Sequence, residues 1–375
     1  MLLFEGHLDI SYNALFHERD PRWTVEETRE RETAPPCDDG RGVCTTSIAE
    51  LRAAGAAVAV TTLLGRSKPW VMPGRPNALG GGDWPTQEMV HAMAHAHLSY
   101  YRALEQSGLV RILDSRNALD AHWDQWATAK EWDELPVGLI ITMECADPIL
   151  RPSDVAYWHE QGLRALFLTH FGKGIYAHGN PSSEPGLQRD CDGPVTAAGR
   201  QLLAEMSKLK LPLDLTHTSD TTFWDAVELY DGPIYSSHSN CRAICPHQRQ
   251  LSDDMIRAIA TRGGVLGVAA AIGMIRADLI EGSPWHPTQH AVTLSHLADH
   301  IERICDLAGN GQQVAIGTDL DGGFGAEACP VDLQRHRDIH RLRDILSERG
   351  WADQQIRELF HENWLAFYRR TLPEA

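Results

Sequence analysis

The segment at residues 137–144, VGLIITME, is an almost continuous apolar run that closes on a carboxylate. Runs of this kind are typical of parallel strands buried on both faces, because neither face alternates with polar residues. Seven further short runs are apolar or β-branched, and most of them close on a polar residue. They are MLLFEGHLD (1–9), AAVAVTTLL (56–64), RALFLTH (164–170), LPLDLTH (211–217), PIYSSH (233–238), GGVLGVAAA (263–271) and QVAIGTD (313–319).

Helical stretches lie between these runs. TSIAELRAAG (46–55) opens on a Thr/Ser cap, carries Glu50 at the capping offset and closes at Gly55. Eight β–α units in succession predict a (β/α)8 TIM barrel, with residues 1–375 as a single domain. The other predicted helices are PSDVAYWHEQG (152–162), TAAGRQLLAEMSKLK (196–210), SDTTFWDAVELY (219–230), LSDDMIRAIATRGG (251–264), LSHLADHIERICDLAG (294–309), and extra C-terminal helices at 331–348 and 352–370.

A doubly wound open sheet is the alternative fold. It fits less well, because no Gly-rich nucleotide loop follows the first strand. Long Pro/Gly-rich connections without regular structure are expected at 11–45 and 65–86, after the first two strands. In a barrel, loops at that end overhang the active site, so we expect both to border the pocket and to tune selectivity.

Composition narrows the class of protein. The 375 residues are 43% hydrophobic, enough for a large core, and the net charge is −17, which disfavours nucleic acid and anionic membranes as partners. We find no secretory signal, spanning segment or membrane anchor, and expect a cytoplasmic protein. The eight scattered cysteines predict reduced thiols; a zinc site at Cys37 and Cys44 is a weaker alternative, because no second pair accompanies them.

Histidines and carboxylates close six of the eight predicted strands. The C-terminal ends of barrel strands meet at one face, so these side chains should converge there. A lone histidine at a strand end is usually structural, but six such residues would each need buried partners of their own. The residues concerned are His7 and Asp9, Glu144, His170, His217, His238 and Asp319.

This set of side chains suits divalent metal ions, zinc first. It is richer than one tetrahedral site needs, and two ions that share a carboxylate would use it well. Such a pair can activate a water molecule and polarise a carbonyl group. No G-x-S-x-G or phosphate-loop motif competes. A second metal cluster at His91, His95 and His97 is a weaker alternative, since we expect these side chains to face solvent from a helix.

Six motifs together resemble the membrane dipeptidase (renal dipeptidase) family of zinc metallopeptidases, within the metallo-dependent hydrolase superfamily. The resemblance spans nearly the whole chain, and its most specific part joins LDLTH (213–217) to SSHSNCRA (236–243). It implies a hydrolase barrel that holds two zinc ions. The motifs are GHLD, TMECADP, LTHFGKGIYAHGN, LDLTHTSDTTFWD, SSHSNCRAICPHQRQLSDDMIRAIA and VAIGTDLDGGFG.

The resemblance also implies a role for each matching residue. His7 and Asp9 would bind the first zinc, His217 and His238 the second, and Glu144 would bridge the two. Asp319 matches a carboxylate that serves as general base and proton shuttle. His170 matches a histidine that contacts the substrate and the developing oxyanion. Arg249 matches an arginine that holds the substrate's terminal carboxylate, for which a guanidinium fork is suited. Two departures from the family are Cys145 and His361, where glycine is common.

The implied activity is hydrolysis of small dipeptides by a hydroxide bound between the two zinc ions, with a D-residue accepted at the C-terminal position. An amidohydrolase for another small amide, such as an N-acyl amino acid or a cyclic amide, is the alternative within enzymes. A metal-binding protein without catalysis is the alternative of another class; the presence of every implied ligand and of Asp319 argues against it. Small dipeptides are the expected partners, and a homodimer is compatible with this interpretation.

Overall fold

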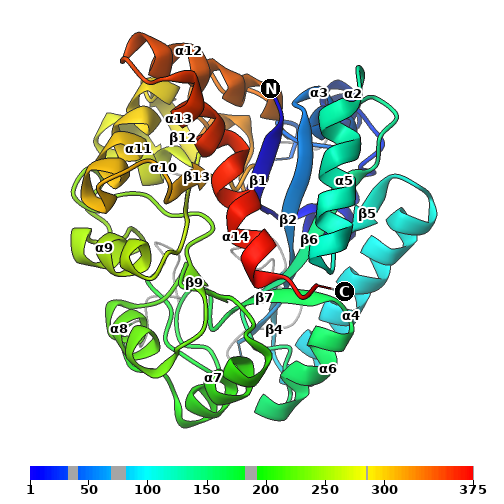
Figure 1. Ribbon diagram of the computed structural model, residues 1–375, viewed down its shortest axis with the longest axis vertical. Coiled ribbons are helices and arrows are strands. Elements are labelled where there is room, and N and C mark those ends of the chain that lie inside the picture. The colour runs from blue at the N-terminus through cyan, green and yellow to red at the C-terminus, as the bar shows by residue number, and fades with distance from the viewer. Residues whose placement is uncertain (33–40, 69–81, 182–191, 284–285, 375) are drawn as a thin grey trace.

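A computed structural model describes the whole chain except residues 33–40, 69–81, 182–191, 284–285 and 375. Parallel strands occupy the middle of the molecule, and helices surround them (Figure 1). Six strands pair in parallel in the order β1-β2-β6-β7-β8-β9. They are β1 (Leu3–Leu8), β2 (Ala56–Leu64), β6 (Val137–Glu144), β7 (Leu163–Phe167), β8 (Leu213–Asp214) and β9 (Ile234–Tyr235).

Two further strands complete the ring. A parallel bridge joins Ser236, just after β9, to Leu266 in β10 (Leu266–Val268), and β10 pairs in parallel with β13 (Val314–Ile316). Just after β13, the amide of Thr318 donates to Glu5 Oε1 of β1 at 2.7 Å. All eight predicted strands are present. The predicted (β/α)8 barrel is therefore confirmed, and the alternative, a doubly wound open sheet, is wrong.

The seam between β1 and β13 explains the Glu-Gly pair inside an otherwise apolar strand. Glu5 is fully buried and accepts from the amides of His7 and Thr318, and His336 Nε2 lies 3.1 Å from its Oε2. A Cβ at Gly6 would lie 2.7 Å from the Trp364 ring and 2.8 Å from the main-chain oxygen of Ile316. Only glycine lets β1 come this close to Trp364 and Ile316. Glu5 and Gly6 therefore serve to close the barrel between β1 and β13.

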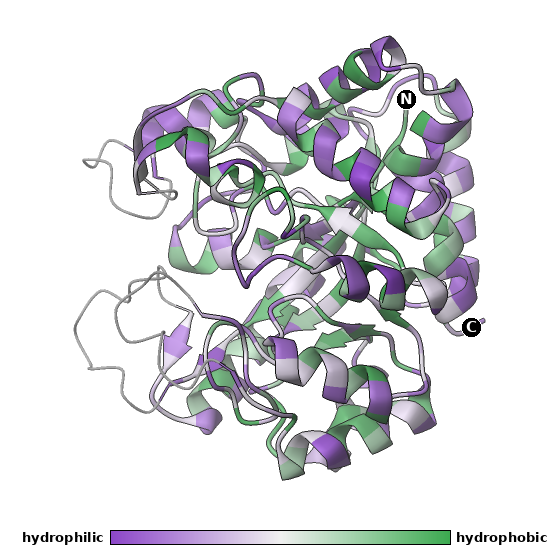
Figure 2. Ribbon diagram, turned by 90° about the vertical axis from the view of Figure 1, so that its left-hand side faces the viewer, coloured by the Kyte–Doolittle hydropathy of each residue, from purple (hydrophilic) through white to green (hydrophobic). Residues whose placement is uncertain are grey.

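The helices that cover the barrel begin where the sequence places their caps. The hydroxyl of Ser47 accepts from Glu50 N, Thr196 from Gly199 N, and Ser252 from Met255 N. Hydropathy follows the same arrangement, with apolar strands inside and hydrophilic residues on the outer helices (Figure 2). The predicted helices are α3 (Ile48–Ala53), α4 (Gln87–Gln106), α6 (Val155–Glu160), α7 (Ala197–Leu209), α8 (Asp220–Leu229), α9 (Asp253–Thr261), α11 (Leu294–Ala308), α12 (Arg341–Glu348), α13 (Asp353–Arg357) and α14 (Asn363–Thr371).

Several elements were not predicted. The connection 11–45 is not irregular throughout, because it contains helices that the Pro/Gly content obscures. A strand, β5, adds to β6 outside the ring. The unpredicted elements are α1 (Ile10–Phe16), α2 (Val25–Arg31), β3 (Arg66–Ser67), β4 (Asp83–Trp84), β5 (Val110–Ile112), α5 (Arg116–Thr128), α10 (Ile272–Ile275), β11 (Ile280–Ser283) and β12 (His286–His290).

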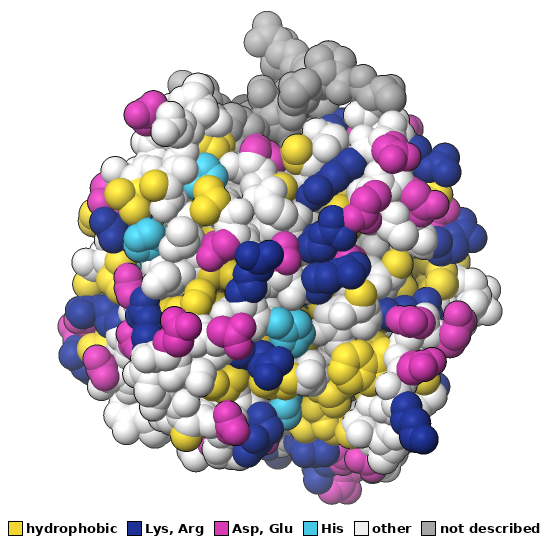
Figure 3. Space-filling view, turned by 90° about the horizontal axis from the view of Figure 1, so that it is seen from above, with side chains coloured by type: hydrophobic (Ala, Val, Ile, Leu, Met, Phe, Trp, Pro, Cys, Tyr) yellow, Lys and Arg dark blue, Asp and Glu magenta, His cyan; other side chains and the backbone are white. Residues whose placement is uncertain are grey.

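The described cysteines are free thiols, which confirms the expected reduced state for six of the eight; Cys37 and Cys191 lie outside the described residues. Within the described chain, no helix combines the length and the apolar character that crossing a membrane requires. On the face shown in Figure 3, acidic and basic side chains are interspersed over the part that the structure describes.

Candidate metal centre

The barrel brings the seven predicted strand-end residues to one place. His7 lies in β1 and Asp9 follows that strand, while Glu144 is the last residue of β6. The other four, His170, His217, His238 and Asp319, each lie three residues past the end of a strand, after β7, β8, β9 and β13 respectively. Six of the seven are buried, and the side chain of Asp319 is 13% exposed.

Glu144 lies at the middle of this group, and its two oxygens face different neighbours. Oε2 lies 3.6 Å from His7 Nε2. Oε1 lies 3.4 Å from His170 Nε2, 3.3 Å from His217 Nε2 and 3.7 Å from His238 Nε2. One carboxylate therefore stands between two sets of nitrogen and oxygen atoms.

On the side of Oε2, a histidine and two carboxylates come together. His7 Nε2 lies 4.0 Å from Asp9 Oδ2 and 3.7 Å from Asp319 Oδ1. The hydroxyl of Thr62, in β2, donates to Asp9 Oδ1 and orients that carboxylate. His7, Asp9 and Asp319 offer atoms close enough together to hold one metal ion.

On the side of Oε1, two imidazole nitrogens face each other. His217 Nε2 and His238 Nε2 are 3.1 Å apart. Two nitrogens bound to one tetrahedral zinc ion lie about 3.3 Å apart, given Zn–N distances of about 2.0–2.1 Å. The spacing of His217 and His238 therefore fits a shared ion without rearrangement.

Burial keeps these imidazoles neutral, which is the form that binds metal. Desolvation, together with the nearby charge of Arg249, lowers the pKa of His7 to about 3. The pKa values of His217 and His238 are also well below the usual range, with burial as the main cause.

The carboxylates show the opposite shift. Burial raises the pKa of Asp9 to about 6, and it raises the pKa of Glu144 and of Asp319 well above the usual range, with mutual repulsion as a further cause. Three carboxylates this close together, two of them buried, require a compensating positive charge if they are to stay ionised.

Two orphaned atoms test whether a cation fits here. Within the described chain, His7 Nε2 and Glu144 Oε2 are buried without a hydrogen-bond partner, although the two atoms are only 3.6 Å apart. Buried polar atoms are rarely left unpaired. A divalent ion among His7, Asp9, Glu144 and Asp319 would satisfy both atoms, so the residues present fit a metal ion.

Arg249 also reaches the centre, from the long loop after His238. Nη1 donates to Ser239 Oγ at 2.9 Å, and Nη2 donates to the main-chain oxygen of His238 at 2.8 Å. Nη2 also lies 3.4 Å from His217 Nε2. Burial lowers the pKa of Arg249 to about 10, so it remains a cation at neutral pH. All eight predicted site residues are thus close together.

Sequence reasoning missed Arg66. This buried residue lies two positions past the end of β2, and its Nη1 lies 2.9 Å from His170 Nδ1. The other strands that contribute to the site are marked by a histidine or a carboxylate at their ends, and β2 offers neither. A basic residue just past a strand end was the available signal. Arg66 also shows that the start of the connection 65–86 borders the site; residues 69–81 of that connection lie outside the described chain.

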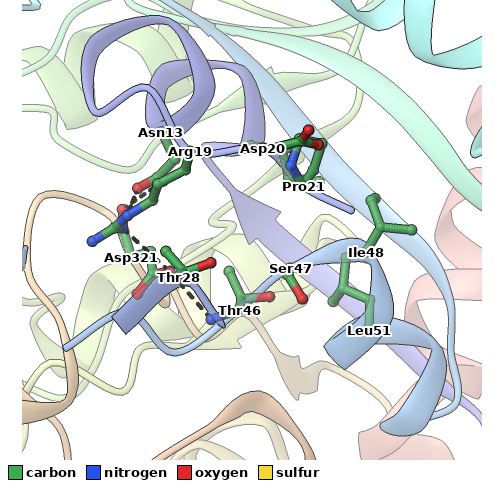
Figure 4. Close-up of a pocket in the computed structure, with 11 residues that line it drawn as sticks. Asn13, Arg19, Asp20, Pro21, Thr28, Thr46, Ser47, Ile48, Leu51 and Asp321 are labelled. Atoms are coloured by element: carbon green, nitrogen blue, oxygen red, sulfur yellow. Dashed lines mark hydrogen bonds and ion pairs between the residues drawn. The ribbon is translucent and has the colours of Figure 1, made fainter. Parts of the chain in front are cut away.

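A second group of polar residues supports the segments that carry Asp9 and Asp319 (Figure 4). Asn13 Nδ2 donates to the main-chain oxygens of Asp9 and Asp321, at 3.0 and 2.9 Å. Arg19 Nη1 donates to Asn13 Oδ1 at 2.6 Å and lies 3.5 Å from Asp321 Oδ2. The pocket drawn there is braced by these contacts, and they fix the two carboxylate segments relative to each other.

The sequence predicts that the three histidines of α4 face solvent, and this prediction is wrong for His97. His97 is fully buried, with Nδ1 2.6 Å from Ser11 Oγ, because it lies on the face of α4 that packs on the barrel. His91 and His95 are half-buried, and their Nε2 atoms are 3.2 Å apart. His91 Nδ1 lies 2.9 Å from the oxygen of Pro148, so a hydrogen-bonded chain accounts for this pair.

Comparison with known proteins agrees with the geometry. Residues 80–372 match the family described as Membrane dipeptidase (Peptidase family M19). A protein of Klebsiella pneumoniae, described as an uncharacterized protein in the pqqA 5' region, is 30% identical over 219 residues, which is 56% of this chain and 73% of that protein. An uncharacterized dipeptidase of Schizosaccharomyces pombe is 28% identical over 214 residues, 57% of this chain but only 48% of its own length.

Solved structures show the same fold. The crystal structure of dipeptidase AC, a metallopeptidase of family M19, superposes with a TM-score of 0.74 at 24% identity, covering 100% of this chain and 99% of that one. A metallopeptidase from Rhodobacter sphaeroides, liganded with a phosphinate mimic of the dipeptide L-Ala-D-Ala, superposes with a TM-score of 0.73 at 23% identity, covering 99% of each chain.

Proposed function

Because this chain belongs to the membrane dipeptidase family, peptidase family M19, we propose that it is a metal-dependent dipeptidase with two zinc ions bridged by Glu144, in a single barrel domain. One observation carries the proposal: the two oxygens of Glu144 face different candidate ligands, Oε2 towards His7 and Oε1 towards His217. His7 and Asp9 would hold one ion, and His217 and His238 the other. Bound there, the ions would supply Lewis acidity for the substrate carbonyl and lower the pKa of the attacking water.

Asp319 takes the role of proton carrier. Of the three central carboxylates it is the most exposed, with a side chain 13% accessible against 6% for Asp9 and 2% for Glu144. A carboxylate in that position can accept the proton of the attacking water and return it to the leaving amine. A carboxylate that both accepts and returns a proton acts as general base and then as general acid.

Arg249 sets the length of the substrate. A dipeptide presents a free carboxylate at a fixed distance from its only peptide bond. The guanidinium lies beside His217 and keeps donors beyond those that it gives to Ser239 and His238. A carboxylate held there places the scissile bond over the metal centre, and longer peptides lack that carboxylate at the required distance.

The substrate proposal includes dipeptides with a D-residue at the C-terminal position. It is supported by the Rhodobacter sphaeroides relative, which binds a mimic of L-Ala-D-Ala. The cytoplasmic location stays a prediction, to be checked by cell fractionation. A homodimer is compatible with the sequence, and sedimentation velocity against a chain mass of 41.7 kDa would test it.

The test combines metal analysis with a substrate panel. We expect about two zinc equivalents per chain, loss of activity on chelation and recovery on adding zinc. L,L-, L,D- and D,D-dipeptides should be compared with N-acyl amino acids and cyclic amides. A metal-replete protein with a single equivalent would overturn the dinuclear site. Preference for N-acyl or cyclic amides would favour the amidohydrolase alternative, and two equivalents without any hydrolysis would favour a metal-binding protein.

A further inference from the structure

Arg66 makes an unusual contact with the site. It is 1% exposed, and its Nη1 lies 2.9 Å from Nδ1 of His170. A guanidinium carries only donors and cannot give up its proton at ordinary pH. Nδ1 of His170 therefore has to accept this hydrogen bond with a lone pair. The remaining proton of a neutral imidazole then resides on Nε2.

We propose that Arg66 is a positioning residue that fixes His170 as the Nε2–H tautomer and so makes it a hydrogen-bond donor in the site, not a metal ligand. The inference rests on the proposed function for what the donor would contact, but the tautomer itself is independent of any substrate. Distances alone do not decide whether His170 is a donor or a metal ligand, because His170, Glu144 and His217 offer atoms close enough together to hold an ion. The hydrogen-bond partner of His170 Nδ1 decides between the two roles.

Two neighbouring histidines show the contrast. His238 Nδ1 lies 2.8 Å from Ser237 Oγ, and His7 Nδ1 lies 3.4 Å from the same hydroxyl. A hydroxyl can accept as well as donate, so either ring can carry its proton on Nδ1 and direct the lone pair of Nε2 at a metal ion. Arg66 denies His170 that arrangement. One barrel thus sorts similar imidazoles into two chemical roles.

The surroundings of Arg66 keep its guanidinium in place. It lies in β3, directly opposite Asp83 of β4, and its Nε is 2.6 Å from Asp83 Oδ1. A buried arginine without a counter-charge would destabilise the fold, so Asp83 is needed to hold the Arg66 guanidinium beside His170. Two residues further on, Lys68 Nζ donates to the main-chain oxygen of Phe171 at 2.8 Å, which ties β3 to the segment that carries His170.

In the proposed reaction, Nε2–H of His170 points at the side of the centre where Glu144 Oε1 lies, 3.4 Å away. A donor there can stabilise negative charge that develops on the substrate's carbonyl oxygen. Removing one such donor typically costs about 10²–10³ in kcat. Without Arg66, His170 is free to adopt the other tautomer, in which Nε2 is a lone pair that repels the oxyanion and competes for metal.

The test reads the tautomer directly. Zinc-loaded protein labelled with ¹⁵N at histidine is examined by two-bond ¹H–¹⁵N correlation, and the His170 signals are those lost in His170→Gln. We expect the Nε2–H pattern in the wild type, and the Nδ1–H pattern or a mixture in Arg66→Met. An Nδ1–H or metal-bound His170 in the wild type would overturn the proposal, whatever the activity.

Kinetics supply the second readout. Arg66→Met should lower kcat about 100-fold, with KM changed only a few-fold and metal content unchanged. Arg66→Lys, which still offers only donors, should recover part of kcat. Arg164→Met is the matched control, because Arg164 is also buried but donates to main-chain oxygens outside the site. Unchanged kcat in Arg66→Met would refute the positioning role. Inactive wild type with Nε2–H at His170 would instead refute the dipeptidase.

Discussion

Arg249 donates a hydrogen bond through Nη2 to the main-chain oxygen of His238, at 2.8 Å. The guanidinium proposed to bind the substrate's carboxylate is thereby hydrogen-bonded to the main chain of a candidate metal ligand. The hydrogen bonds to His238 and Ser239 hold the guanidinium in place, although Arg249 itself lies on the loop eleven residues past His238. An enzyme with this arrangement should discriminate strongly against substrates whose carboxylate lies at a different distance from the scissile bond.

Arg249→Ala should therefore impair free dipeptides and spare dipeptide amides. Hydrogen bonds to charged groups contribute about 1.5–3 kcal/mol, which corresponds to a loss of about one to two decades in kcat/KM. Arg249→Lys should recover only part, because an ammonium lacks the planar fork. Metal content should not change, and Arg257→Ala, on the outer surface of α9, serves as the control. Equal losses for free and amidated dipeptides would remove the carboxylate-reading role.

Asp319→Asn should keep much of the metal but lose most turnover. The amide preserves size and one oxygen but cannot accept a proton at neutral pH. General acid–base groups contribute about 10²–10⁴ in rate, and we expect a loss of that size in kcat. Metal analysis of the same preparation is the control for site integrity. Near-normal turnover with full metal would assign proton transfer to another group.

At position 145, glycine should be more stable than alanine. Cys145 has a φ of +84°, in the left-handed region that costs a non-glycine residue about 1–2 kcal/mol. Its side chain is fully buried, so Cys145→Gly and Cys145→Ala both remove the thiol and differ mainly in backbone strain. Denaturant unfolding should show the glycine variant more stable by about 1 kcal/mol. Equal stabilities would mean that the backbone relaxes when the thiol is removed.

Stability should fall on mild acidification, in part through His300. Its Nδ1 accepts from Cys241 N at 3.0 Å, its Nε2 lies 2.9 Å from the oxygen of Ile275, and burial lowers its pKa from 6.5 to about 4. Between these two values the unfolded chain binds the extra proton and the folded chain does not. This contribution is therefore fully present above pH 6.5 and is lost as the pH falls toward 4.

The slope of this pH dependence is the measurement. One such histidine contributes up to about 1.4 kcal/mol of unfolding free energy per pH unit within the window. Denaturant unfolding between pH 7.5 and 4.5 should therefore give a shallower decline for His300→Gln than for the wild type, even though the variant is less stable overall. Identical slopes would show that His300 takes up its proton equally in both states.

How far the sequence predicted the fold depended on the kind of signal. Buried parallel strands are long apolar runs, and all eight could be found, together with the polar residues at their ends. Those end residues converge, although their roles in metal binding stay predictions. Arg66 was missed because it follows β2 without a histidine or carboxylate to mark the place, and its function depends on His170, which is far away in the sequence.

Other differences have local causes. The burial of His97 could not be told from that of His91 and His95, because all three lie on one helix and only packing against β2 decides which face is covered. The left-handed backbone at Cys145 had one visible sign, the glycine that the family resemblance implies is common there. The helices α1 and α2 are short, seven residues each, so their periodicity is weak against the surrounding turn-forming residues.

The contact between Glu5 and Thr318, which joins β1 to the segment after β13, has a consequence for biosynthesis. β1 pairs on one side with a segment 313 positions further along the chain, so the ring cannot close until that segment has been synthesised. Contacts of such long sequence separation form slowly. His7 and Asp319 lie on either side of this seam, and the centre is incomplete until it closes. The candidate metal centre can therefore form only after the segment that carries Asp319 has been synthesised and has docked against β1.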